Sequence, residues 1–329
     1  MEAIVISKFG GPEVLQHQTV PKPTPVNGEV LIKVKAFGVN HAEMHMRRGE
    51  WDQWNPVSGL ECVGIVEACP GGEFRVGSKV AGVMGGMGRE RPGGYGEYVN
   101  VPVTNVVLLE SELPWEQLAA LPEVYSTAWS CLFTILGLQR GETLLIRGAT
   151  STIGQAALNL AIDAGAVVTV TTRRGDRFEK LKELGAVDVK YERSGLASQF
   201  STGKIEGEQF KFDKTLNLIG NSVLVESIAI TRPGGRMLQA GWLGGLDPIR
   251  NFNPMIEMES GVHFSLFHSK VLGTTYFPLG AIPLQDIARK IEQGNWDAKP
   301  SHVFEYKDIQ KAHEILDSHN AGGKIVVRH

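Results

Sequence analysis

The chain has 329 residues, enough for two domains with their own hydrophobic cores. Hydrophobic residues make up 42% of it and charged residues 21%, and a formal net charge of −3 gives no basis for binding nucleic acid or an anionic membrane. No apolar run approaches the roughly 20 residues that a membrane span needs. The three cysteines, Cys62, Cys69 and Cys131, are odd in number and scattered, which favours reduced thiols and a cytoplasmic location.

The N-terminal third of the chain is predicted to be rich in β-strand. Residues 29–37 alternate between apolar and polar side chains, and shorter segments of strand character follow. Turns rich in glycine and proline separate these segments. The shorter strands are predicted at residues 62–68, 79–83 and 95–101.

From about residue 118 the pattern changes to helices that alternate with apolar strands, which is typical of a parallel sheet. After about residue 265 the pattern becomes mixed again. In this second part, strands are predicted from residue 143 and at residues 167–172, 214–218, 235–240 and 324–327, and helices at residues 153–164, 177–184, 222–230, 284–293 and 309–318.

Residues 143–154 are the most informative segment, because an apolar strand enters a turn of small residues and continues as a helix. The first turn of such a helix presents unpaired N–H groups and the positive end of the helix dipole, which suit a pyrophosphate. Gly148 permits the tight turn, and Gly154 lets the helix pack closely on the sheet. Ser151 and Thr152 replace the usual middle glycines. We therefore expect a bound dinucleotide here.

Three arginines follow the second strand of this unit. An NAD-binding protein usually carries an acidic residue at this point to bind the ribose 2′-hydroxyl. This chain instead has Arg173, Arg174 and Arg177, whose guanidinium groups suit a 2′-phosphate, with Asp176 as the nearby acid. The alternative is a solvated basic loop. The sequence favours NADPH over NADH.

The order of these elements resembles the medium-chain dehydrogenase/reductase superfamily over essentially the whole chain, and most closely its zinc-independent quinone oxidoreductase branch. The motifs that carry the resemblance lie at residues 38–49, 92–98, 126–128, 232–235 and 322–327. The resemblance implies an α/β fold. A GroES-like β-rich catalytic domain is expected at residues 1–120 and 266–329, and a doubly wound Rossmann domain that binds NADPH at residues 121–265.

The resemblance also bears on metal binding. The positions that hold the catalytic zinc in the zinc alcohol dehydrogenases read Asn40, Leu60 and Glu123 here, and leucine cannot bind a metal. The alternative is a pair of histidines four residues apart, His41 and His45. We expect no metal.

The resemblance further implies site residues. Many members of this branch carry a tyrosine where this chain has His45, and a histidine can donate a hydrogen bond or a proton near neutral pH. Asn40 resembles the asparagine beside the nicotinamide. The catalytic residues expected are therefore His45 and Asn40, although His45 could instead be an ordinary partly buried histidine. The residues expected to bind the cofactor are Asn40, Thr127, Gly148, Ala149, Thr150, Ser151, Thr152, Ile153, Thr172, Arg173, Arg174, Arg177, Tyr191, Gly241 and Trp242.

The function expected is NADPH-dependent, zinc-independent reduction of a quinone or an α,β-unsaturated carbonyl compound. One alternative is an enoyl reductase that acts on a thioester or polyketide intermediate. Another is a nucleotide-binding protein with little catalysis. The branch commonly pairs its nucleotide-binding domains edge to edge, so we expect a homodimer and predict residues 269–275 as the edge strand.

Overall fold

The computed structural model describes residues 1–200, 210–318 and 321–329. The chain divides into two compact units. Unit 1 comprises Met1–Ser126 and Ser269–His329, and unit 2 comprises Thr127–His268. The boundaries expected for the two functional domains, after residues 120 and 265 of the chain, stay a prediction.

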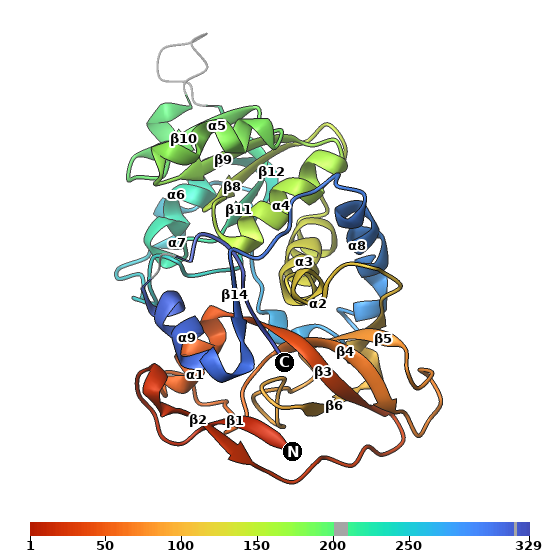
Figure 1. Ribbon diagram of the computed structural model, residues 1–329. Coiled ribbons are helices and arrows are strands. Elements are labelled where there is room, and N and C mark those ends of the chain that lie inside the picture. Colours follow the sequence, from red (N-terminus) through yellow and green to blue (C-terminus); the bar gives the residue numbers. More distant parts are fainter. Residues whose placement is uncertain (201–209, 319–320) are drawn as a thin grey trace. The chain divides into compact units, whose positions relative to one another are not determined.

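Unit 1 is built on a mostly antiparallel sheet (Figure 1). The strands of this sheet are β3 (Glu29–Val39), β4 (Glu61–Ala68), β5 (Lys79–Val83), β6 (Tyr98–Pro102), β7 (Val106–Leu108), β14 (His302–Glu305) and β15 (Ile325–Arg328). Their order is β14-β15-β3-β4-β5-β7, and β6 also pairs with β3. Two further strands, β1 (Glu2–Ile6) and β2 (Leu15–Thr19), form a separate antiparallel pair.

Helices cover parts of unit 1 and close its core. They are α1 (His41–Arg47), α2 (Trp115–Leu118), α8 (Leu284–Glu292) and α9 (Ile309–Asp317). Ile309, Ala312 and Leu316 have helical spacing on α9 and pack in one hydrophobic cluster with Ile32 and Phe37 of β3. The helix α3 (Pro122–Trp129) crosses the division between the two units.

Unit 2 contains a parallel sheet with the strand order β10-β9-β8-β11-β12-β13. Its strands are β8 (Thr143–Arg147), β9 (Val167–Thr172), β10 (Asp188–Tyr191), β11 (Phe212–Asn217), β12 (Thr231–Gln239) and β13 (His263–Leu266), and its helices are α4 (Thr152–Asp163), α5 (Phe178–Glu183), α6 (Leu224–Ala229) and α7 (Pro254–Glu257). This order is the 3-2-1-4-5-6 order of the doubly wound dinucleotide-binding fold. The predicted fold class, GroES-like plus Rossmann, is confirmed.

The predicted edge strand at residues 269–275 is wrong. Ser269–Val271 forms a 3-10 turn, and Gly273 has a φ of +87°. The backbone N–H groups of Leu272 and Thr274 donate to the carbonyls of Ser269 and Val271 at 3.0 and 3.2 Å, so they are engaged in local turns and not in a strand ladder. The strand at that edge of the parallel sheet is β13.

The strand predicted at residues 95–101 begins at Tyr98. Tyr95 lies outside β6, and its buried hydroxyl lies 3.0 Å from Nε2 of His313. Among the helices that the structure describes, none is long and apolar enough to cross a membrane.

Candidate functional site

The turn between β8 and α4 has the geometry of a phosphate-binding turn. Gly148 has a φ of +86°, in the left-handed region that glycine adopts without strain. A Cβ on Gly154 would lie 2.5 Å from the carbonyl oxygen of Gly148, so the helix can approach the turn this closely only with glycine there. The N–H groups of Thr152 and Ile153 belong to the first turn of a 12-residue helix, which leaves them without intrahelical acceptors. These residues fit a nucleotide pyrophosphate.

Ser151 caps this helix and fixes the turn. Its hydroxyl accepts a hydrogen bond from the N–H of Gly154 at 3.1 Å and donates to the carbonyl of Gly148 at 2.8 Å. The hydroxyl proton of Ser151 is therefore engaged within the turn. The backbone N–H groups are the donors that remain for phosphate oxygens.

A buried ion-pair network lies directly beneath the turn. Arg147, at the end of β8, is fully buried, and its guanidinium donates to Glu192 at 2.5 and 3.2 Å. It also pairs with Glu226 at 3.0 Å. Glu192 accepts the hydroxyl of Thr171 at 2.5 Å, and that hydroxyl accepts the N–H of Gly148 at 3.1 Å. The network thus links the ends of β8, β9 and β10 to the first residue of the turn.

The predicted adenosine-binding residues gather at the end of β9. The hydroxyl of Thr172 accepts the N–H of Arg174 at 3.0 Å and lies 3.4 Å from the hydroxyl of Thr150 in the turn. The guanidinium of Arg174 pairs with Asp176 at 2.8 Å, and this pair holds the pKa of Asp176 below its usual range. The Tyr191 ring packs 4.6 Å from the ring of Phe178 on the same side of the loop.

The remaining predicted cofactor residues of unit 2 come from its other elements. Gly241 and Trp242 follow β12, and a Cβ on Gly241 would lie 2.7 Å from the carbonyl oxygen of Leu218 at the end of β11. The Trp242 ring lies 5.7 Å from the ring of His268. Thr127 is buried on α3.

Unit 1 holds a buried ammonium group where the zinc ligands of the metal-dependent relatives were expected to align. Lys324 precedes β15, and the pairing of Ile325 with Val39 places it opposite Asn40. Its Nζ donates to Asn40 Oδ1 and to Glu61 Oε1, both at 2.5 Å. Glu61 in turn accepts the N–H of Glu123 at 2.9 Å.

Glu43 completes this cluster. It accepts the N–H of Asn40 at 2.9 Å, which closes a capping box at the start of α1, and the N–H of Leu60 at 3.0 Å. Burial raises the pKa of Glu43 to about 7, against the Leu60 hydrogen bond and the charge of Lys324. A Cβ on Gly38 would lie 2.3 Å from Glu61 Oε1, so glycine makes room for the network.

His45 lies on α1 in a different set of contacts. Its Nδ1 forms a short hydrogen bond with the Glu50 carboxylate, and its ring stacks on Trp51 with centroids 5.2 Å apart and an interplanar angle of 12°. The side chain is 12% exposed. The alternative metal site is not supported: His41 is exposed, and the described residues contain no group of three or more His, Cys, Asp or Glu suited to a metal ion.

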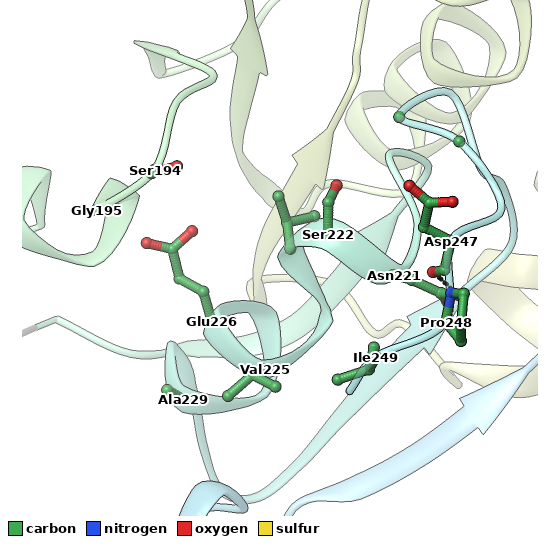
Figure 2. Close-up of a pocket in the computed structure, with 13 residues that line it drawn as sticks. Ser194, Gly195, Asn221, Ser222, Val225, Glu226, Ala229, Asp247, Pro248 and Ile249 are labelled. Atoms are coloured by element: carbon green, nitrogen blue, oxygen red, sulfur yellow. Dashed lines mark hydrogen bonds between the residues drawn. The ribbon is translucent and has the colours of Figure 1, made fainter. Parts of the chain in front are cut away.

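A pocket of about 550 Å³ lies elsewhere on unit 2, beside α6 (Figure 2). Asn221 donates from Nδ2 to the carbonyl of Asp247 at 2.9 Å across one side of it. The predicted cofactor residues do not line this pocket, which meets the Arg147 network at Glu226 and at the carbonyl of Val223. We assign it no part in the predicted chemistry.

Several residues of these networks were missed by sequence reasoning. Arg147 ends an otherwise apolar strand, which is a signal that could have been read as a buried ion pair. Lys324 stands in a motif that carried the family resemblance, but nothing local indicates its partners. Glu192 gives no such signal, because it lies 45 residues from Arg147.

Comparison with known proteins agrees with this architecture. Residues 26–111 match the family described as alcohol dehydrogenase GroES-like domain, and residues 184–327 match zinc-binding dehydrogenase. The chain is 30% identical to the quinone oxidoreductase of Lama guanicoe, over 99% of this chain and 97% of that protein. Its fold is similar to CurK enoyl reductase (24% identity, TM-score 0.82, covering 99% of this chain and 98% of that one). It is also similar to mycobacterial Rv1454c complexed with NADPH (23% identity, TM-score 0.83, covering 100% of both chains).

These matches define an oxidoreductase with a GroES-like domain and a Rossmann-type domain. More narrowly, the chain belongs to the quinone oxidoreductase-like members of the medium-chain dehydrogenase/reductase superfamily. The nucleotide-binding fold of unit 2 supports a nicotinamide cofactor, and the relatives support a small-molecule substrate.

The buried network predicts a large stability effect at Glu192. Glu192→Ala leaves the Arg147 guanidinium buried with one carboxylate fewer, so the free energy of unfolding should fall by about 3 kcal/mol. Glu179→Ala is the control, because Glu179 forms an exposed ion pair with Lys182 and should cost less than about 1 kcal/mol. Urea denaturation measures both. Equal losses in the two variants would show that the buried network stabilises the fold no more than an exposed ion pair does.

The Lys324 cluster predicts that no zinc is bound. An ammonium group already neutralises Glu61, and Leu60 offers no ligand. Elemental analysis of the purified protein should find no stoichiometric metal, and a chelator should leave turnover unchanged. One tightly bound zinc per chain would contradict this and revive His41, His45 and Glu61 as ligands.

Proposed function

We propose that the protein is an NADPH-dependent oxidoreductase that reduces a quinone or an α,β-unsaturated carbonyl compound by hydride transfer. Unit 2 binds NADPH in this proposal, through a domain at residues 121–265. Unit 1 carries the acceptor, through a domain at residues 1–120 and 266–329. The observation that carries the proposal is similarity to quinone oxidoreductases along 99% of the chain, together with a phosphate-binding turn.

The cofactor choice rests on the loop after β9. Arg173 and Arg174 are exposed there, and the nearby carboxylate, Asp176, is itself solvated and paired with Arg174. A pair in water is screened and easily exchanged, so a 2′-phosphate can compete for the guanidinium groups. Bound NADPH supplies the hydride to the acceptor. Arg173, Arg174 and Arg177 bind its 2′-phosphate in this proposal.

NADPH should therefore bind at least tenfold more tightly than NADH, since charge-assisted hydrogen bonds contribute about 1.5–3 kcal/mol each. The double variant Arg173→Ala/Arg174→Ala should weaken NADPH binding and leave NADH binding nearly unchanged. Arg250→Ala is the matched control, because Arg250 is an exposed arginine of the same unit, away from this loop. Fluorescence titration with both nucleotides measures the preference, and equal affinities in the native protein would refute it.

His45 is the proton donor in this proposal. Hydride reaches a carbon of the acceptor and leaves negative charge on an oxygen, which a hydrogen-bond donor stabilises. Nδ1 of His45 is engaged by Glu50, so Nε2 is the ring nitrogen that offers a proton to that oxygen in this proposal. Trp51 fixes the ring plane. Asn40 serves the cofactor, and its amide is fixed by Lys324 and Glu61.

His45→Phe keeps the ring volume and removes the proton, so kcat/KM should fall by roughly ten- to a thousandfold. The kcat/KM of His45→Ala should fall by a similar factor. NADPH affinity should barely change in either variant, whereas Asn40→Ala should weaken cofactor binding and turnover together. Steady-state kinetics with a quinone and an enone measure these effects. Full activity of His45→Phe would mean that solvent protonates the acceptor.

We further propose a homodimer, by analogy with the branch, through the edge strand β13. Its residue Leu266 is exposed, and its outer edge pairs with no other strand of the described sheet. Light scattering at micromolar concentration should give twice the chain mass of 35.8 kDa. A monomer at that concentration would refute the dimer.

Enoyl reduction of a thioester is the second candidate. It is favoured by 29% identity between 93% of this chain and a segment that makes up 14% of a highly-reducing polyketide synthase. Both reactions add hydride to an activated double bond, so an acceptor panel of quinones, enones and enoyl thioesters separates them by kcat/KM. A protein that binds NADPH and reduces none of these compounds would be a nucleotide-binding protein with little catalysis.

A further inference from the structure

A left-handed loop follows β5 in unit 1. Met84 has a φ of +57°, and among the described residues the one other non-glycine with positive φ is Asn251. Gly85, Gly86 and Gly88 continue the same conformation. Backbone strain of this kind persists where the surrounding structure enforces it, and it concentrates at binding sites. The loop therefore marks a place where the chain holds a particular side chain in position.

The side chain that the loop positions is Arg89. Its backbone N–H donates to the carbonyl of Gly86 at 3.1 Å, and the carbonyl of Gly88 accepts the N–H of Asn55 at 2.9 Å. A Cβ on Gly88 would lie 3.0 Å from the N of Gly59. Contacts of the loop with Asn55 and Gly59 thus fix the backbone position of Arg89.

The guanidinium of Arg89 lacks the carboxylate partner that buried arginines elsewhere in the chain possess. Arg47 pairs with Asp317 at 2.7 Å, and Arg147 pairs with Glu192. Among the described arginines that are not exposed, Arg89 is the one without an ion pair, and its buried Nε has no hydrogen-bond partner. Burial lowers its pKa, with the charges of Glu43 and Glu90 acting against this shift. A half-buried fork of donors with no carboxylate within ion-pair distance suits an anionic ligand.

Arg89 also lies next to the predicted proton donor. Its guanidinium carbon is 5.0 Å from the centre of a Trp51 ring, and the His45 ring stacks on the same Trp51 at 5.2 Å. The indole of Trp51 therefore lies beside both the His45 ring and the Arg89 guanidinium. An anion bound by Arg89 would lie within a small molecule's length of His45.

We propose that Arg89 binds a carboxylate of the acceptor, so that the substrate is an α,β-unsaturated carbonyl compound that carries an acid group. This inference rests on the proposed function for the reaction, but the anion site itself does not depend on turnover. A phosphate could offer the same oxygens. The short separation between Arg89 and His45 favours a carboxylate, because that group can be part of the reacting molecule itself. Arg89 is a specificity-determining residue in this account.

Binding tests the site without catalysis. The probes are 4-oxopentanoate and its methyl ester, which differ in the negative charge, and inorganic phosphate is a third. Saturation-transfer NMR on the native full chain should show the acid binding at least tenfold more tightly than the ester. Arg89→Gln should abolish that difference, and Arg89→Lys should restore part of it. Arg91→Gln is the matched control, because Arg91 pairs with Glu29 and should keep the preference.

Turnover then tests the substrate class. With NADPH, 4-oxopent-2-enoate should be reduced with at least tenfold higher kcat/KM than its methyl ester. Arg89→Gln should lower kcat/KM for the acid at least tenfold more than for the ester. Equal losses for acid and ester would overturn the inference and make Arg89 a donor to the reacting oxygen.

The two proposals fail in different ways. If neither compound is reduced but the acid still binds through Arg89, the proposed reaction fails and the carboxylate site stands. If the ester is reduced as well as the acid, and the acid binds no better in the native chain than in Arg89→Gln, the carboxylate site fails and the reaction stands. Phosphate binding more tightly than the acid at Arg89 would overturn the choice of a carboxylate.

Discussion

The buried guanidinium of Arg147 connects the elements on which the nucleotide turn depends. It ends β8, pairs with Glu192 after β10, and reaches Gly148 through the hydroxyl of Thr171 on β9. A buried charge is costly unless it is paired, so the network favours the mutual arrangement of these three strand ends that keeps the guanidinium paired. That arrangement brings Thr172 of β9 within 3.4 Å of Thr150 in the turn. The pyrophosphate end and the adenosine end of the predicted cofactor site are therefore set by one interaction.

Unit 1 also contains a buried cation that is paired with a carboxylate. Lys324 is buried and paired with Glu61 and Asn40, and Glu43 draws the start of α1 toward Leu60. This cluster fixes Asn40 at the N-terminus of α1, and His45 lies further along that helix. The His45 ring stacks on Trp51, and the guanidinium of Arg89, from the left-handed loop, lies near the same indole. In the proposals above, Lys324 holds Asn40 in place, His45 donates the proton and Arg89 binds the carboxylate of the acceptor.

Short-range sequence patterns predicted those elements that depend on neighbouring residues. The strands at residues 79–83 and 167–172 and the glycine turn before α4 were predicted because alternation, apolar runs and glycine placement are short-range signals. The segment at residues 269–275 looked like a strand, but the turn around Gly273 takes its hydrogen bonds locally. The pairs of Lys324 with Glu61 and of Arg147 with Glu192 join residues 263 and 45 positions apart, so no local pattern could indicate them. The assigned roles of Asn40, His45 and the arginines after β9 stay predictions.

Isotope transfer tests the central claim most directly. NADPH deuterated at the transferable position of the nicotinamide is incubated with the protein and an enone, and the product is examined by NMR and mass spectrometry. The account predicts one deuterium at the β-carbon of the saturated product and a proton from solvent at the α-carbon. Binding of NADPH with no deuterium in any enone or enoyl thioester product, and with no oxidation of NADPH by any quinone, would contradict it.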